Sequence, residues 1–234
     1  MQEIYEEIER IIAEQFSKSR EEHRREFAEE FSALASPHKR FILKKLSANL
    51  CNERTRRFLI KAAESDNEII RINACDTIGI YDDDEILELL LRITEHDSSE
   101  FVINCALISI CSILCTRKES INSSQKNSLR NTAPNVISPC TAAGLIIANY
   151  LVGNASTDEI QELFINAKSP TTQLFILNLL HNIVTQNHDQ NLHTTILRLK
   201  NFTLNPEISS KINDILFAYK HKTKILNSNQ TERS

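Results

Sequence analysis

Glycine and aromatic residues are scarce in this chain. Three of its 234 residues are glycine, none is tryptophan, and aromatic residues make up 6%. β-Sheets joined by tight hairpins need glycine-containing turns and alternating apolar and polar residues, and the sequence has neither pattern. The composition therefore predicts an all-α fold, and it leaves few aromatic rings on which nucleic acid bases could stack.

Long hydrophobic runs are also missing. No apolar run reaches the roughly 18 residues that a membrane-spanning helix needs. The first ten residues are acidic and have a helical pattern, which is not the pattern of a secretory signal. We therefore expect a cytoplasmic protein that does not enter a membrane.

The cysteines do not form a metal-binding pattern. None of the six belongs to a CxxC pair, and Cys111 and Cys115 lie one helical turn apart without a histidine close in sequence. Most occupy apolar helical positions, which is typical of buried, reduced thiols. The spacing of Ser, His, Cys and acidic residues supports no catalytic arrangement. We expect no metal, no cofactor and no enzymatic activity.

Predicted helix starts recur along the chain at steps of 29 to 41 residues. At each start a polar side chain is placed to accept a hydrogen bond from a backbone N–H of the first turn. Four of these residues are followed by proline, which loses no hydrogen bond at the first helical position. The other two predict capping boxes, Ser65 with Glu68 and Asp97 with Glu100. A recurrence of roughly 20–50 residues is typical of stacked repeats. The starts are Ser36, Ser65, Asp97, Ser138, Ser169 and Asn205.

This recurrence of helix starts predicts an α-solenoid of antiparallel helix pairs over residues 36–224. Residues 1–35 predict two helices with apolar stripes and polar outer faces, which suits an end cap. Residues 119–135 are polar and interrupt the regular spacing of helix starts, so we interpret them as a loop insertion or a degraded helix. We expect residues 225–234 to be a disordered tail.

The net charge of −4 is distributed in blocks. Residues 38–61 contain eight bases and one acid, and residues 82–100 contain eight acids and one base. In a stack of repeats such blocks become surface patches, which influence partner choice and association rate. The sequence leaves open whether the basic block binds an anion.

One segment resembles the second helix of a HEAT repeat. Residues 66–74 read Asp-Asn-Glu-Ile-Ile-Arg-Ile-Asn-Ala and are followed by Ile78 and Gly79. The family pattern has an acid, an apolar–Arg pair, a small residue, and an apolar residue with Gly. The next unit keeps only part of this pattern. The resemblance implies a HEAT-like superhelix whose second helices line a concave surface, and such repeats mostly bind proteins or peptides. It also implies a structural ladder between Arg71 and Asp66 or Asp97.

We expect a partner protein to meet the charged concave surface, with a basic patch at one end and acids at the other. Positions about half a turn from the predicted buried stripe of the second helices complete this surface. The candidate partner-binding residues are Lys44, Lys45, Arg56, Arg57, Asn73, Asp76, Asp83, Asp84, Asn104 and Ile108.

These observations favour a non-enzymatic protein-binding module, an adaptor or scaffold. A narrower alternative is a bacterial immunity or inhibitor protein that masks a basic toxin domain with its acidic patches. A second alternative is a nucleic-acid-binding protein similar to the HEAT-like DNA glycosylases, which the absence of tryptophan and a pI near 6.0 disfavour. A third is a bilin-lyase-like HEAT protein, for which no individual residue argues.

Overall fold

The computed structural model describes residues 53–117, 121–134, 137–187 and 189–231. Over these ranges the chain is all-α, with ten α-helices, one short 3₁₀-helix and no strand. The predicted end cap at 1–35 and the predicted start at Ser36 lie outside the described residues. The helices are α4 (Glu53–Ala63), α5 (Glu68–Ile78), α6 (Asp84–His96), α7 (Glu100–Thr116), α8 (Ser123–Asn131), α9 (Pro139–Leu151), α10 (Thr157–Asn166), α11 (Pro170–Gln186), α12 (Gln190–Leu199), η2 (Lys200–Phe202) and α13 (Pro206–Thr231).

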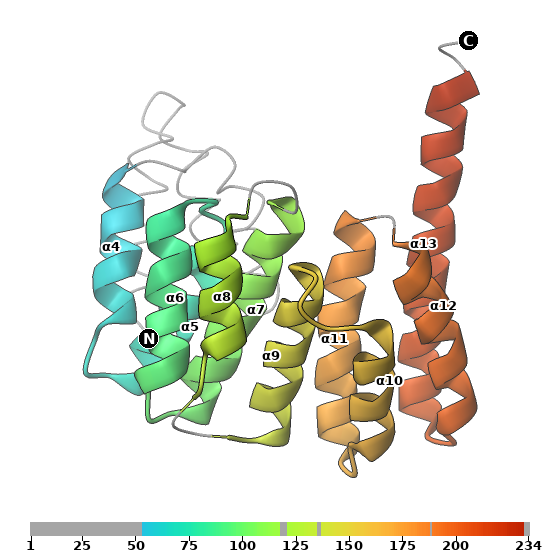
Figure 1. The fold of residues 1–234 in the computed structure, drawn as a ribbon, viewed down its shortest axis with the longest axis horizontal. Coiled ribbons are helices and arrows are strands. Elements are labelled where there is room, and N and C mark those ends of the chain that lie inside the picture. Colours follow the sequence, from blue (N-terminus) through green and yellow to red (C-terminus); the bar gives the residue numbers. More distant parts are fainter. Residues whose placement is uncertain (1–52, 118–120, 135–136, 188, 232–234) are drawn as a thin grey trace, which may run out of the picture.

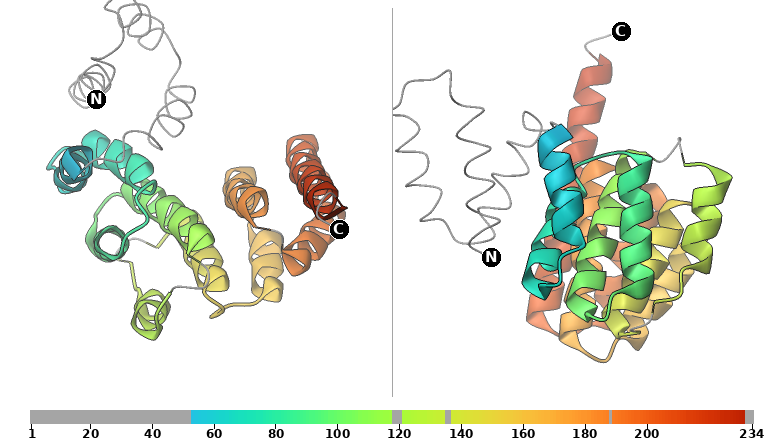
Figure 2. Two further views of the ribbon diagram at one scale, coloured as in Figure 1. Left: turned by 90° about the horizontal axis from the view of Figure 1, so that it is seen from above. Right: turned by 90° about the vertical axis from the view of Figure 1, so that its left-hand side faces the viewer.

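The helices form two rows (Figure 1). Helices α5, α7, α9, α11 and α13 make an inner row in which each helix contacts the next, and α4 packs on α5 at one end. Helices α6, α8, α10 and α12 make an outer row on one side of it. Seen from above, the inner row bends at α9, so that α11 contacts α7 as well as α9 (Figure 2).

The connections lie at two opposite edges of the molecule (Figure 1). We call the edge at which α5, α7, α9, α11 and α13 begin the lower edge; it comprises residues 64–69, 97–101, 137–139, 165–170 and 197–207. The upper edge, where α6, α8, α10 and α12 begin, comprises residues 79–85, 116–117, 121–125, 152–157, 187 and 189–190. The exposed side chains of the two edges differ in chemistry.

The apolar core runs between the two rows. The helical spacing of apolar residues in the sequence predicts burial of six residues, and five of them are fully enclosed, namely Ala74, Ile78, Val102, Ala106 and Ile110. The sixth, Ile70, is half-buried and packs against the core from the first turn of α5. Burial of this apolar surface is the dominant favourable contribution to folding.

Two glycines allow close approach between helices. A Cβ at Gly79 would lie 2.5 Å from Ser109 Oγ and 2.9 Å from Ser109 Cα, so α5 and α7 are in near backbone contact at that point. A Cβ at Gly144 would lie 2.8 Å from Leu107 Cδ1. Glycine therefore sets the separation of α7 from the neighbouring helix on each side.

Two predicted helix caps are wrong by two residues. The side chains that cap α5 and α7 belong to Asn67 and Ser99, not to Ser65 and Asp97. Ser65 Oγ instead accepts from the backbone N–H of Asn67 over 3.2 Å. Asp97 Oδ1 likewise accepts from the backbone N–H of Ser99 over 2.8 Å. Each predicted residue therefore forms the turn that precedes the cap, because short polar side chains stabilise such turns as readily as helix starts.

The described part of residues 119–135, for which the sequence left a loop insertion or a degraded helix open, contains a helix, and the predicted tail over 225–234 differs from the structure. Residues 123–131 form α8, which begins with a capping box between Asn122 and Gln125. Leu129 anchors this polar helix in the core. The backbone of α13 continues as a helix to Thr231 and extends past the ends of the other helices (Figure 1). Polarity alone was therefore a poor indicator of loop structure at both places.

Candidate functional site

The acids predicted to meet a partner are engaged within the chain at the upper edge. Arg56 Nε lies 2.9 Å from Asp83 Oδ2, and the same guanidinium pairs with Glu85. Arg117 Nε lies 2.7 Å from Asp82 Oδ1, and its Nη1 lies 2.6 Å from Asp84 Oδ1. We call Arg56, Asp82, Asp83, Asp84, Glu85 and Arg117 the upper-edge network. It links α4, the start of α6 and the end of α7.

The upper-edge network favours the ionised forms of Asp83 and Asp84. The hydrogen bond from Arg56 lowers the pKa of Asp83 despite partial burial, and the backbone N–H of Ile86 adds to the effect. The guanidinium of Arg117, with Gln125, lowers the pKa of Asp84. Asp83 is also the N-cap of α6, where negative charge complements the helix dipole. These contacts give the acids a structural role.

Arg71 bridges two segments of the lower edge, residues 64–69 and 97–101. Its Nε lies 2.7 Å from Asp97 Oδ2, and its Nη1 donates to the backbone carbonyls of Ser65 and Asp66. The Asp97 side chain is 8% exposed and the Arg71 side chain 16%. The Arg71 ladder therefore forms with Asp97 through the side chain and with Asp66 through the backbone.

The remaining predicted partner-binding residues do not form one cluster. Asn73 Nδ2 donates to the carbonyl of Ile69 in its own helix, and Asn104 Oδ1 accepts from Thr141. Ile108 packs against the core, and Arg57 is exposed beside Glu53. Asp76 is half-buried on α5. Lys44 and Lys45 lie outside the described residues.

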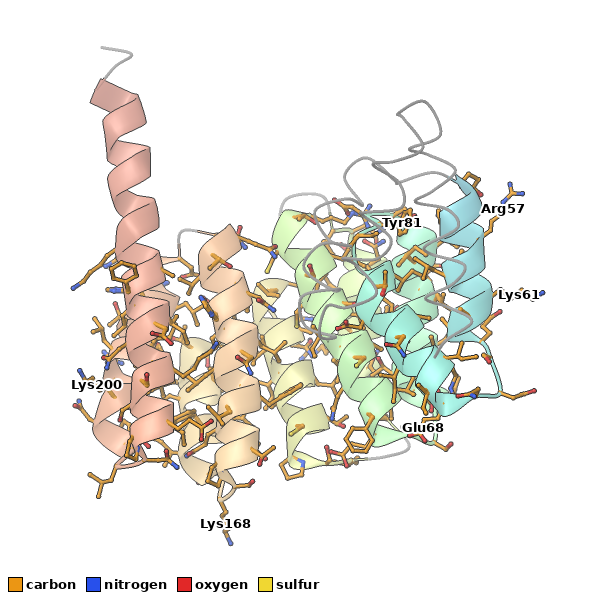
Figure 3. All side chains as sticks on the ribbon, turned by 180° about the vertical axis from the view of Figure 1, so that it is seen from behind. Arg57, Lys61, Glu68, Tyr81, Lys168 and Lys200 are labelled. Carbon is orange, nitrogen blue, oxygen red and sulfur yellow. The ribbon has the colours of Figure 1, made fainter. Side chains whose placement is uncertain are left out.

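The inner row presents a stripe that carries almost no charge. Helices α7, α9 and α11 contain no Lys or Arg, and Glu100 is their one acid. Figure 3 views this row from the side opposite the outer row. A helical period places the exposed and half-buried side chains of α7 and α11 on two stripes there. They include Phe101, Cys105, Ile108, Ser112, Thr171, Leu174, Phe175, Asn178 and Asn182. Sequence reasoning missed this stripe, although the uncharged composition of these helices was a readable signal.

A second polar cluster joins α9, α12 and α13. Tyr150 donates to Asp189 over 2.6 Å, and Tyr219 donates to Gln190 over 2.8 Å. The ring of His193 stacks on Tyr219 with centroids 4.1 Å apart. Burial raises the pKa of Tyr150, so its hydroxyl stays protonated and acts as a donor. The cluster secures the start of α12 to both neighbouring helices.

In the described part of the chain, no group of His, Cys, Asp and Glu is arranged to hold a metal ion. Over the same residues, none of the helices combines the length and apolar character that crossing a lipid bilayer requires. Comparison of the chain with protein-family models, with curated proteins and with solved structures finds no match.

Proposed function

We propose that this protein is a HEAT-like α-solenoid of antiparallel helix pairs that binds another protein through its inner row. The observation that supports the proposal best is the uncharged stripe along α7 and α11. It combines exposed amides with apolar groups, and Phe101 is 69% exposed within it. An exposed aromatic ring beside hydrogen-bonding side chains is typical of protein-binding surfaces.

The side chains of this stripe indicate what kind of partner segment it can bind. Asn178 and Asn182 are exposed on the same face of α11, one turn apart, and their amides can donate to and accept from a peptide backbone. Leu174 and Phe175 are half-buried beside them and offer apolar contact. A peptide segment with few charges fits this surface. The binding surface that we propose is thus uncharged, unlike the charged concave surface expected from the sequence.

The centre of the inner row, formed by α7, α9 and α11, does not favour the nucleic acid alternative. Phosphate groups are bound mainly by Lys and Arg, and α7, α9 and α11 contain neither residue. A segment of protein can instead be bound through hydrogen bonds and apolar contacts. Protein binding remains our proposal, with inhibition of a toxin domain as one of its forms.

Site-specific photo-crosslinking in the native host tests the proposal. A photoreactive amino acid replaces Asn178 in one protein and Glu88, which is exposed on the outer row, in a matched control. We expect one discrete protein adduct from position 178 and no corresponding adduct from position 88. Equal labelling from both positions, or no protein adduct at 178, would contradict the proposal.

The crosslinked protein then permits a quantitative test with purified components. The double variant Asn178→Arg, Asn182→Arg places two charges on the uncharged stripe without disturbing the core. We expect affinity to fall at least about tenfold, or roughly 1.4 kcal/mol, because a neutral segment would have to desolvate both charges. Glu88→Arg should bind like the original protein. Unchanged binding by the inner-row variant would exclude this surface.

A further inference from the structure

The large exposed apolar side chains gather at the lower edge. Among the described residues, eight such side chains are exposed, and seven lie within a turn of a lower-edge connection. Leu204 is fully exposed, Ile137 is 79% exposed and Phe101 is 69% exposed. Phe217, near the middle of α13, is the exception. The seven, in chain order, are Ile69, Phe101, Ile137, Ile165, Leu197, Phe202 and Leu204.

The upper edge has none of these apolar side chains in its described part and carries the upper-edge network instead. Exposed apolar residues scattered singly need no explanation, but a row confined to one edge indicates an interaction surface. The row extends along all five starts of the inner helices, from Ile69 in the first turn of α5 to Leu204 before α13.

The charges along the lower edge separate by sign (Figure 3). Glu68 marks the α5 end, and Lys168 and Lys200 mark the α11–α13 end. Asp66, Glu68 and Glu100 lie beside Ile69 and Phe101. Lys168, Arg198 and Lys200 lie beside the apolar residues of the other half, where Glu207 is the acid in the first turn of α13. Ile137 occupies the middle, at the start of α9.

A row of apolar side chains that is flanked by acids at one end and by bases at the other is complementary to itself after a half-turn. We propose that the lower edge binds a second copy of this chain in a two-fold symmetric dimer. The acidic half of each protomer faces the basic half of its partner, and Ile137 lies near the axis. Isologous contacts of this kind are the commonest in soluble oligomers. The proposal does not require binding at the inner row, with which the lower edge shares Phe101.

A charge-swap experiment tests both the surface and its symmetry. One variant reverses the acidic half, Asp66→Lys with Glu100→Lys, and the other reverses the basic half, Lys168→Glu with Lys200→Glu. All four residues lie in connections, in the first turn of α7 or in η2, and the caps Asn67 and Ser99 are kept. Circular dichroism melting of each variant verifies that it folds.

The readout is mass by light scattering or sedimentation over a concentration series at low salt. We expect the unmodified protein to approach twice the 26.8 kDa of one chain. Each variant alone should stay monomeric, because both halves of its interface would pair like charges. An equal mixture of the two should dimerise again, because every contact then joins opposite charges. A monomeric unmodified protein, dimers of either variant alone, or a mixture that stays monomeric would overturn the proposal.

A matched pair of apolar variants separates this edge from other exposed surface. Phe101→Ser removes an exposed ring from the lower edge, and Phe217→Ser removes an equally exposed ring from α13, whose side chain is 71% exposed. The first should raise the dimer dissociation constant at least about tenfold, and the second should leave it unchanged. Equal effects of the two substitutions would contradict the assignment.

Discussion

At the scale of single residues, position in the fold decides what a charge does. Arg71 and Arg92 both pair with an acid from a neighbouring helix pair. The Arg71–Asp97 pair is largely enclosed, whereas the side chains of Arg92 and Glu64 are 64% and 56% exposed. Enclosed pairs are costly to break because the remaining charge loses its partner without regaining water. Exposed pairs contribute little.

We predict that Asp97→Ala lowers the free energy of unfolding by about 2–3 kcal/mol. The substitution leaves Arg71 without its carboxylate and removes the acceptor for the Ser99 N–H. Arg92→Ala is the control and should cost about 0.5 kcal/mol or less. Urea denaturation of both variants measures the difference, and equal losses would show that enclosure of the Arg71 pair is unimportant.

At the scale of helices, a close approach between neighbouring elements limits which larger side chains can replace a glycine. At Gly79 the nearest atoms include the backbone of Ser109, which belongs to the next inner helix. At Gly144 the nearest atoms belong to the side chain of Leu107. A side chain can rotate away from an added methyl group, but a packed helix backbone cannot move without disturbing its other contacts.

Gly79→Ala should therefore destabilise the protein by about 1–3 kcal/mol through overpacking between α5 and α7. Gly79 has a φ of −63°, so alanine would meet no backbone strain there. Gly144→Ala should cost less, because the three nearest atoms there are side-chain atoms of Leu107 and none belongs to the backbone. Thermal unfolding of the two variants gives the order, and a larger loss for Gly144→Ala would contradict this account.

The contact between α11 and α13 should make stability depend on pH. Nζ of Lys211 lies 3.2 Å from Nδ1 of His181. Burial, together with the Lys211 charge, lowers the pKa of His181 below its usual 6.5, and Asp214 opposes this only in part. The folded protein thus binds the imidazole proton less tightly than the unfolded chain does. The contribution of His181 is fully present above pH 6.5 and is lost as pH falls below it.

We expect His181→Gln to flatten this dependence. The free energy of unfolding of the original protein should fall between pH 7.5 and pH 5.5 by more than that of the variant. Urea denaturation at the two pH values measures both changes. A parallel decrease in the two proteins would show that other groups are responsible.

At the scale of the whole molecule, one core connects both rows, so its centre should open only on global unfolding. Cys75 and Cys111 are buried on α5 and α7, and burial raises the pKa of both thiols. A protonated, enclosed thiol is a poor nucleophile. Their reaction with a thiol reagent therefore reports exposure of the core.

We predict that these two thiols react in native buffer only at the rate of global unfolding. Cys140 is partly exposed and should react faster. In denaturant without reductant, all six cysteines should titrate, and fewer would contradict the expected reduced state. Mass spectrometry of the labelled peptides assigns each rate, and rapid labelling of Cys111 would show that the core opens locally.

Local patterns determined much of the fold. The spacing of apolar residues predicted the helices and five enclosed core positions, because helical period and burial follow from neighbours along the chain. Ser138 caps α9 as predicted, and Asn205 caps α13, through hydrogen bonds that span only two or three residues. The caps at Ser65 and Asp97 were wrong because the same side chains also stabilise the preceding turn, and composition alone could not separate the two roles.

Only the tertiary structure decided which charged side chains are paired within the chain and which are available to a partner. Arg56 and Asp83 are 27 residues apart in sequence, and their pairing depends on how α4 meets the start of α6. The same folding brings apolar residues from five separate connections to one edge and leaves the centre of the inner row uncharged. Sequence blocks of charge indicated that patches exist, but pairing across the stack neutralises some of them, and that pairing is set by packing rather than by local sequence.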